Sequence, residues 1–148
     1  MNIKNYTSSV PVNITVARIE HLLAQAGATG VNKDYHNGSL TALAFRIQTP
    51  TGNTLTIRLP ANQQAVFDTM KKSVSRPRQG TMEKLQDQAG RTAWKLLQDW
   101  VEVQISLIQM QQADVLQVFL PYVWNEEFQS SFYSLLKDGG FKQLTAPK

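Results

Sequence analysis

Two neighbouring segments alternate between apolar and polar residues, and this pattern constrains the fold more than any other feature. Residues 40–48 and 54–59 each place an apolar side chain at every second position, which is the period of a strand with one buried face. Turn-forming Pro and Gly at 50–52 separate them. An Asn-Gly pair at 37–38 follows a shorter strand predicted at 31–36. The pattern therefore predicts an antiparallel β-meander.

The polar face of this meander is expected to carry positive charge. Lys33, Arg46 and Arg58 are assigned to the outward positions of the three strands. A further strand is predicted at residues 5–12, which contain Tyr, Thr and Val. The predicted fold class is therefore α+β: an antiparallel β-meander of three or four strands packed on helices, with a long central helix and a helical C-terminal part.

Four polar residues are predicted to begin helices. A short polar side chain at a helix start accepts a hydrogen bond from a free backbone N–H of the first turn. The predicted caps, each followed by apolar residues at helical spacing, are Thr15, Asn62, Asp114 and Asn125. The helix after Thr15 is expected to end at residue 26, and the helix after Asn62 near residue 74.

The longest predicted helix covers residues 81–112, about 45 Å at 1.5 Å per residue. It has two apolar stripes, one that includes the expected core residues Trp94 and Trp100, and a second made of Leu96, Val103, Leu107 and Met110. A helix with one solvent-exposed face has a single apolar stripe. The helix therefore either runs through the core or forms a homo-oligomer contact. Gly90 leaves open whether it is continuous.

The length of 148 residues predicts a single domain, 1–148, with a helix and the sheet in 1–60 and a mainly helical part in 61–148. The chain is 42% hydrophobic and 18% charged, as folded proteins are, and it has no cysteine. Residues 1–10 are polar, without the apolar core of a signal peptide. No stretch is apolar enough to span a membrane. We expect a cytoplasmic protein with no membrane partner.

The sequence contains no recognisable pattern for catalysis, so a non-enzymatic protein without a cofactor is predicted. The two histidines, His21 and His36, have no nearby carboxylates at metal-ligand spacing, which predicts no metal site. Glycines 27 and 30 follow a helix, whereas a phosphate-binding loop lies between a strand and a helix. No serine stands in a nucleophile-elbow context.

Positive charge is concentrated in one segment. Residues 71–95 contain seven basic residues against two acidic ones, a surplus of five, while the whole chain carries +4. Such a cluster favours an anionic partner: an acidic protein face, a nucleotide or a nucleic acid. A solvated loop and helix start is the competing interpretation. The predicted partner- or phosphate-binding residues are Arg46, Arg58, Lys71, Lys72, Arg76, Arg78, Lys84, Arg91 and Lys95.

Several segments, taken together, resemble a diverse group of small, uncharacterised proteins from tailed phages and prophages. The similar segments are residues 6–12, 27–30 with 34–35, 42–47, 58–62, 91–95 with 99–102, and 118–122. The resemblance implies a phage origin and, for a phage-encoded protein, the cytoplasm of the host cell. Small phage proteins without catalytic motifs often block host defence factors or assist recombination.

Two functions follow as expectations. The first is a counter-defence protein that binds and blocks a host nucleic-acid-targeting effector, or sequesters the nucleotide that activates it. The alternative is a DNA- or RNA-binding accessory protein of phage replication or recombination. Most late aromatic residues follow helical spacing and are expected in the core; Trp124 is the ring expected to be exposed.

Overall fold

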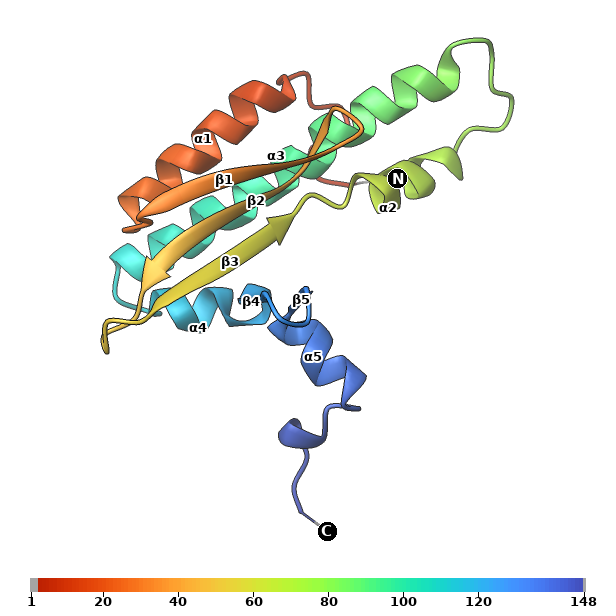
Figure 1. Ribbon diagram of the computed structural model, residues 1–148. Helices are drawn as coiled ribbons and strands as arrows, with labels where there is room; N and C mark the ends of the chain where they lie inside the picture. The colour runs from red at the N-terminus through yellow and green to blue at the C-terminus, as the bar shows by residue number, and fades with distance from the viewer. Residues whose placement is uncertain (1–2, 148) are drawn as a thin grey trace.

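The computed structural model describes residues 3–147, and a three-stranded antiparallel sheet is its centre (Figure 1). The strands β1 (Gly30–His36), β2 (Ser39–Gln48) and β3 (Thr54–Pro60) lie in the order β1-β2-β3. Phe45 lies opposite Val31 and Ile57, so apolar residues of the three strands share one face. The predicted α+β class and the meander are confirmed.

The tight turn between β1 and β2 follows the prediction from its Asn-Gly pair. Asn37 and Gly38 have φ values of 50° and 80°. Asparagine and glycine tolerate this left-handed region better than other residues, and the resulting turn matches the twist of a hairpin. The register shifts between Asp34 and Tyr35, where β1 contains a bulge or irregularity.

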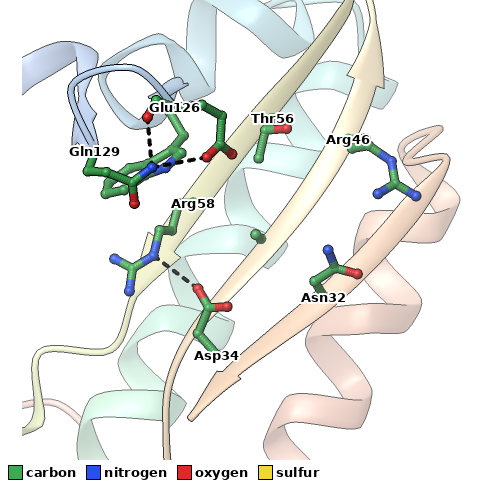
Figure 2. A pocket seen from close by; sticks show the side chains of 9 residues that line it. Asn32, Asp34, Arg46, Thr56, Arg58, Glu126 and Gln129 are labelled. Atoms are coloured by element: carbon green, nitrogen blue, oxygen red, sulfur yellow. Dashed lines mark hydrogen bonds and ion pairs between the residues drawn. The ribbon is translucent and has the colours of Figure 1, made fainter. Parts of the chain in front are cut away.

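Helices α1 (Val12–Gln25) and α3 (Thr81–Gln109) cover the apolar face of the sheet. Figure 2 shows both helices behind the strands. Ile19 and Leu23 of α1 and Trp94 of α3 are fully buried in the same cluster as the apolar residues of β2 and β3. Among residues 3–147, only one face of the sheet is covered by helices in this way.

Helix α3 is continuous through Gly90, which answers the question its sequence left open. Gly90 is buried where α2 (Gln63–Lys71) crosses, and a Cβ there would lie 3.3 Å from the side-chain oxygen of Gln63. The Gln63 side chain also donates to the Leu40 carbonyl at 2.7 Å. The glycine therefore allows α2 to pack closely against α3 and the sheet.

A short helix closes one end of the core. Helix α4 (Val115–Phe119) begins at Asp114, whose side chain accepts from the Gln117 N–H at 2.8 Å, as predicted. The Phe119 ring packs edge-to-face on Phe45 at 5.2 Å and on Trp100 at 5.7 Å between centroids. Such contacts join the sheet, α3 and α4 through one aromatic cluster. The 3-10 turn Leu120–Tyr122 follows.

The region after the turn differs from the prediction, because Asn125 does not cap a helix. It belongs to a two-stranded hairpin of β4 (Trp124–Asn125) and β5 (Ser130–Ser131). Ser131 caps the last helix, α5 (Phe132–Asp138), and a 3-10 turn (Lys142–Leu144) follows. The isolated bridge between Val123 and Ile57 holds the chain beside β3, the edge strand of the sheet, and the residues that follow turn back on themselves as a hairpin instead of starting a helix.

The N-terminal predictions are also corrected. Residues 5–12 form no strand, because α3 side chains hydrogen-bond their backbone: Thr92 donates to the Asn5 carbonyl, and Gln88 to that of Ser8. Helix α1 begins at Val12, after Pro11, rather than after Thr15. Proline has a fixed φ and suits a helix start. Thr15 is instead fully buried in the second turn.

The second apolar stripe of α3 is only partly covered. Leu96 and Leu107 are half-buried, whereas Val103 and Met110 are 56% and 71% exposed. A homo-oligomer contact along this helix stays a prediction. No helix among residues 3–147 has the length and apolar composition needed to cross a membrane.

We predict that Trp94→Ala lowers the free energy of unfolding by about 3–5 kcal/mol, because it removes a fully buried indole and leaves a cavity. Trp94→Phe should cost about 1–2 kcal/mol, since it keeps most of the packing. The indole N–H has no hydrogen-bond partner among the described residues. Urea unfolding measures both values. Equal costs for the two variants would show instead that the N–H makes an important hydrogen bond.

Candidate functional site

The face of the sheet that points away from α1 and α3 forms the floor of a cleft of about 620 Å³, here called the sheet cleft. The β4–β5 hairpin forms its wall (Figure 2). The volume lies within the range of small-molecule sites. The lining side chains are Asn32, Asp34, Ala44, Arg46, Thr56, Arg58, Trp124, Glu126 and Gln129.

Arg46 supplies an exposed positive charge to this cleft. Its guanidinium crosses β1 at Gly30, where any Cβ would collide with it. Gly30 and Arg46 are Cα partners in the sheet register, so the glycine provides the space that the arginine occupies. Arg46 forms no ion pair with residues 3–147. The charge is therefore available to an anion.

Arg58 is held in place by two neighbours. Its Nε donates to Asp34 Oδ2 at 3.0 Å, and its guanidinium carbon lies 5.0 Å from the centroid of the Trp124 ring. The ion pair fixes the direction of the side chain, and the ring contact adds a cation–π attraction. The Nη1 and Nη2 groups donate to no described residue, so they remain free to bind a phosphate or carboxylate.

The hairpin wall is ordered by its own hydrogen bonds. Gln129 Nε2 donates to the Glu126 carbonyl at 2.7 Å and to the Glu126 carboxylate at 3.2 Å. The Phe128 N–H donates to Asn125 Oδ1 at 3.0 Å. These bonds close the turn beside Trp124, which is half-buried and lines the cleft. The ring expected to be exposed is thus placed beside Arg58.

The sheet cleft is polar but balanced in charge. Arg46 and Arg58 face Asp34 and Glu126, and Asn32 and Thr56 add uncharged polar groups. This composition suits a ligand that combines an anionic group with hydrogen-bonding and ring surfaces. Among residues 3–147, no three His, Cys, Asp or Glu side chains are grouped so that they could hold a metal ion.

Lys33, which was assigned to the outward face, lies on the helix side. It is the Cα partner of Leu43, a core residue, and opposed residues of a sheet point to the same side. Its Nζ reaches Glu20 of α1 at 2.9 Å. The hydrogen bond to Glu20 and the charge of that carboxylate raise the pKa of Lys33. Lys33 therefore joins α1 to the sheet edge.

The structure divides the basic run into two groups. Five exposed residues lie at the end of α2, in the connection and at the start of α3, which together project beyond the sheet (Figure 1). We call this group the basic arm: Lys71, Lys72, Arg76, Arg78 and Lys84. It forms no ion pair with the described part of the chain. The arm and the sheet cleft are separate surfaces.

The second group, Arg91 and Lys95, lies under the N-terminal segment. Arg91 Nε donates to the Ser8 carbonyl at 3.1 Å, and its Nη2 to Gln88 Oε1 at 2.7 Å. Lys95 Nζ pairs with Asp99 at 3.3 Å. Both cations already have partners inside the fold: Arg91 tethers the N-terminal segment to α3, and Lys95 pairs with Asp99 of the same helix.

Asp99 is the centre of this tether. Its carboxylate accepts from Asn5 Nδ2 at 2.8 Å and pairs with Lys4 at 3.4 Å as well as with Lys95. Burial acts to raise the pKa of Asp99, but the hydrogen bonds from Asn5, Lys95 and Lys4 and the charge of Lys95 outweigh burial and lower it. The folded protein therefore favours the ionised carboxylate.

Sequence reasoning identified Arg46, Arg58 and Trp124 but missed the rest of the lining. Thr56 could have been found, because it alternates with Arg58 on β3. Glu126 and Gln129 could not, because they reach the sheet only through the bridge between Val123 and Ile57.

Comparison with known proteins finds no family model, no curated protein and no solved structure that matches this chain. The phage resemblance therefore remains a prediction.

We predict that Asp99→Asn destabilises the protein by about 1 kcal/mol at pH 7, because the ion pairs with Lys4 and Lys95 are lost. The folded pKa of Asp99 lies below its unfolded value of about 3.9, so this stabilisation is complete above that value. It disappears as pH falls through the folded pKa. Urea unfolding of both proteins from pH 7 to pH 2 should show the difference shrinking toward zero; a difference independent of pH would refute the assignment.

Proposed function

We propose that the protein is a non-enzymatic binding protein that holds a nucleotide in the sheet cleft. One observation carries the proposal: Arg46 and Arg58 share a cleft of ligand size with Trp124. A nucleotide combines a flat aromatic base with anionic phosphate, and this set of side chains can bind both parts.

Each part of the nucleotide has a partner in the cleft. Arg46 has no ion pair among the described residues and offers its guanidinium to a phosphate. The guanidinium of Arg58 lies over the Trp124 ring, and guanidinium groups and aromatic rings are both surfaces on which a base can stack. Asn32 and Thr56 supply hydrogen-bonding groups for the base or the sugar. The balanced charge of the cleft favours a ligand that is more than a simple anion.

For a phage-type protein, this binding would serve counter-defence by sequestering the nucleotide that activates a host nucleic-acid-targeting effector. Direct blocking of the effector protein is the other form of the same function. The geometry favours sequestration, because a cleft suits a small ligand and a protein partner requires about 800 Å² of surface on each side. The bound nucleotide would be released chemically unchanged.

We predict that Arg46→Gln weakens nucleotide binding about tenfold, because it removes one charge-assisted hydrogen bond to phosphate. Isothermal titration calorimetry with a panel of nucleoside monophosphates and triphosphates measures the affinity, and chromatography after incubation should recover each nucleotide intact.

Arg18→Gln is the matched control for that experiment. Arg18 is also an exposed arginine but lies on α1, behind the sheet, so its loss should leave the affinity unchanged. Equal losses of nucleotide affinity in both variants would show that only the overall charge matters. That result would overturn the assignment to the sheet cleft. If no nucleotide in the panel binds, the proposed function is wrong.

One observation favours the alternative, a DNA- or RNA-binding accessory protein. The basic arm contains five exposed cations and projects beyond the sheet (Figure 1). Residues 71–84 include one acidic residue, Glu83. A protruding cationic surface of this kind can track a phosphate backbone without reading sequence.

If the alternative holds, replacing all five arm residues by Gln should weaken duplex DNA binding and flatten its dependence on salt. The slope of log affinity against log salt should fall by about 0.9 for each phosphate that the arm no longer neutralises. Fluorescence anisotropy at salt concentrations from about 50 to about 200 mM measures the slope. The control is the double variant Lys137→Gln, Lys142→Gln. These two exposed lysines lie near the other end of the molecule. An unchanged slope in the arm variant would contradict this function.

A further inference from the structure

A second cleft, of about 610 Å³, adjoins the sheet cleft and extends it. Arg58, Trp124 and Gln129 line both clefts, so the two meet at the cation–π pair of Arg58 and Trp124. We call the second one the hydroxyl cleft, because five hydroxyl-bearing residues line it: Tyr122, Ser130, Ser131, Tyr133 and Ser134. A ligand confined to the sheet cleft would leave half of this continuous surface unused.

The hydroxyl cleft differs from the sheet cleft in charge. None of its lining residues is acidic, and Arg58 is its one cation. The Arg58 Nε is engaged by Asp34, while Nη1 and Nη2 donate to no described residue. A phosphate at the junction of the two clefts could therefore bind the outer edge of this guanidinium. The two nucleosides that this phosphate links would then lie in different clefts.

The hydroxyl cleft also presents an exposed aromatic ring. Tyr133 is 51% exposed on α5, and its only ring contact among the described residues is with Phe141, at 6.0 Å between centroids. Exposed rings beside cations are platforms on which bases stack, whatever their identity. One base can thus stack at Arg58 and Trp124, and a second at Tyr133.

A peptide fits this surface less well. An extended peptide binds a sheet by pairing with a free edge strand. Near the junction that edge is already occupied, because Val123 bridges to Ile57 of β3. The rings, the free Nη groups of Arg58 and the Ser130 hydroxyl remain as available binding groups, and they match a sugar-phosphate chain with bases. The Ser131 and Ser134 hydroxyls already bond to each other.

From these observations we infer that the ligand is a single-stranded oligonucleotide of at least two units, which spans both clefts with its linking phosphate at Arg58. The inference rests on the proposed nucleotide binding and makes it more specific. A dinucleotide should bind at least about tenfold more tightly than the mononucleotide, which is the gain expected from one additional stacked base. Longer strands should add less than about threefold per unit, because the two clefts are then filled.

The test compares adenosine monophosphate, the dinucleotide pApA and the tetranucleotide by titration calorimetry. In Tyr133→Ala, the dinucleotide affinity should fall to that of the mononucleotide, whose own affinity should not change. Tyr133→Phe, which keeps the ring, should behave as wild type. Tyr35→Ala is the control, because Tyr35 is also exposed but lines neither cleft.

The outcomes separate this inference from the proposal beneath it. Equal affinities of the mononucleotide and the dinucleotide would overturn the inference and leave the proposed nucleotide site standing. Loss of mononucleotide binding in Tyr133→Ala would also overturn it, since Tyr133 would not then serve a separate unit. Tetraglutamate binding as tightly as pApA would overturn it too, because charge alone would then be recognised. Failure of every nucleotide to bind would overturn both.

Discussion

Burial of a single face of the sheet is the constraint on which the rest of the structure depends. Leu43, Phe45 and Ile47 of β2 must leave water, and α1 and α3 cover them. Because successive residues of a strand point to opposite sides, the same register turns Arg46 of β2 and Arg58 of β3 to the other face. No helix covers that face within the described part of the chain, so the packing of the core also creates the floor of the cleft.

The wall of the cleft depends on a smaller contact. The bridge between Val123 and Ile57 fixes the chain at the edge of β3, and the Phe119 ring anchors the preceding helix in the core through Phe45. Trp124 follows directly and is held over Arg58. The residues that seal the end of the core therefore also position the aromatic side of both clefts.

The sequence predicted those elements whose signals are local. Alternation defined β2 and β3, the Asn-Gly pair defined the first turn, and Asp114 marked the start of α4. Predictions were wrong where distant contacts decide the conformation. Residues 5–12 are held by side chains of α3, and Asn125 lies in a hairpin that begins directly after Val123, the residue that bridges to β3. The same reason applies to Glu126 and Gln129, which reach the two arginines only in the fold. Asn32 and Asp34 lie on the predicted first strand, but they were missed because Lys33 was assigned to the outward face, which turns its neighbours inward.

The central claim is that the uncovered face of the sheet binds the ligand. Mapping of amide and indole shifts by nuclear magnetic resonance during titration with pApA tests it most directly. We expect the largest changes at Arg46, Thr56 and the Trp124 indole, with little change at the basic arm. Changes confined to Lys71, Lys72 and the residues that follow them up to Lys84 would contradict the claim and locate binding on the arm instead.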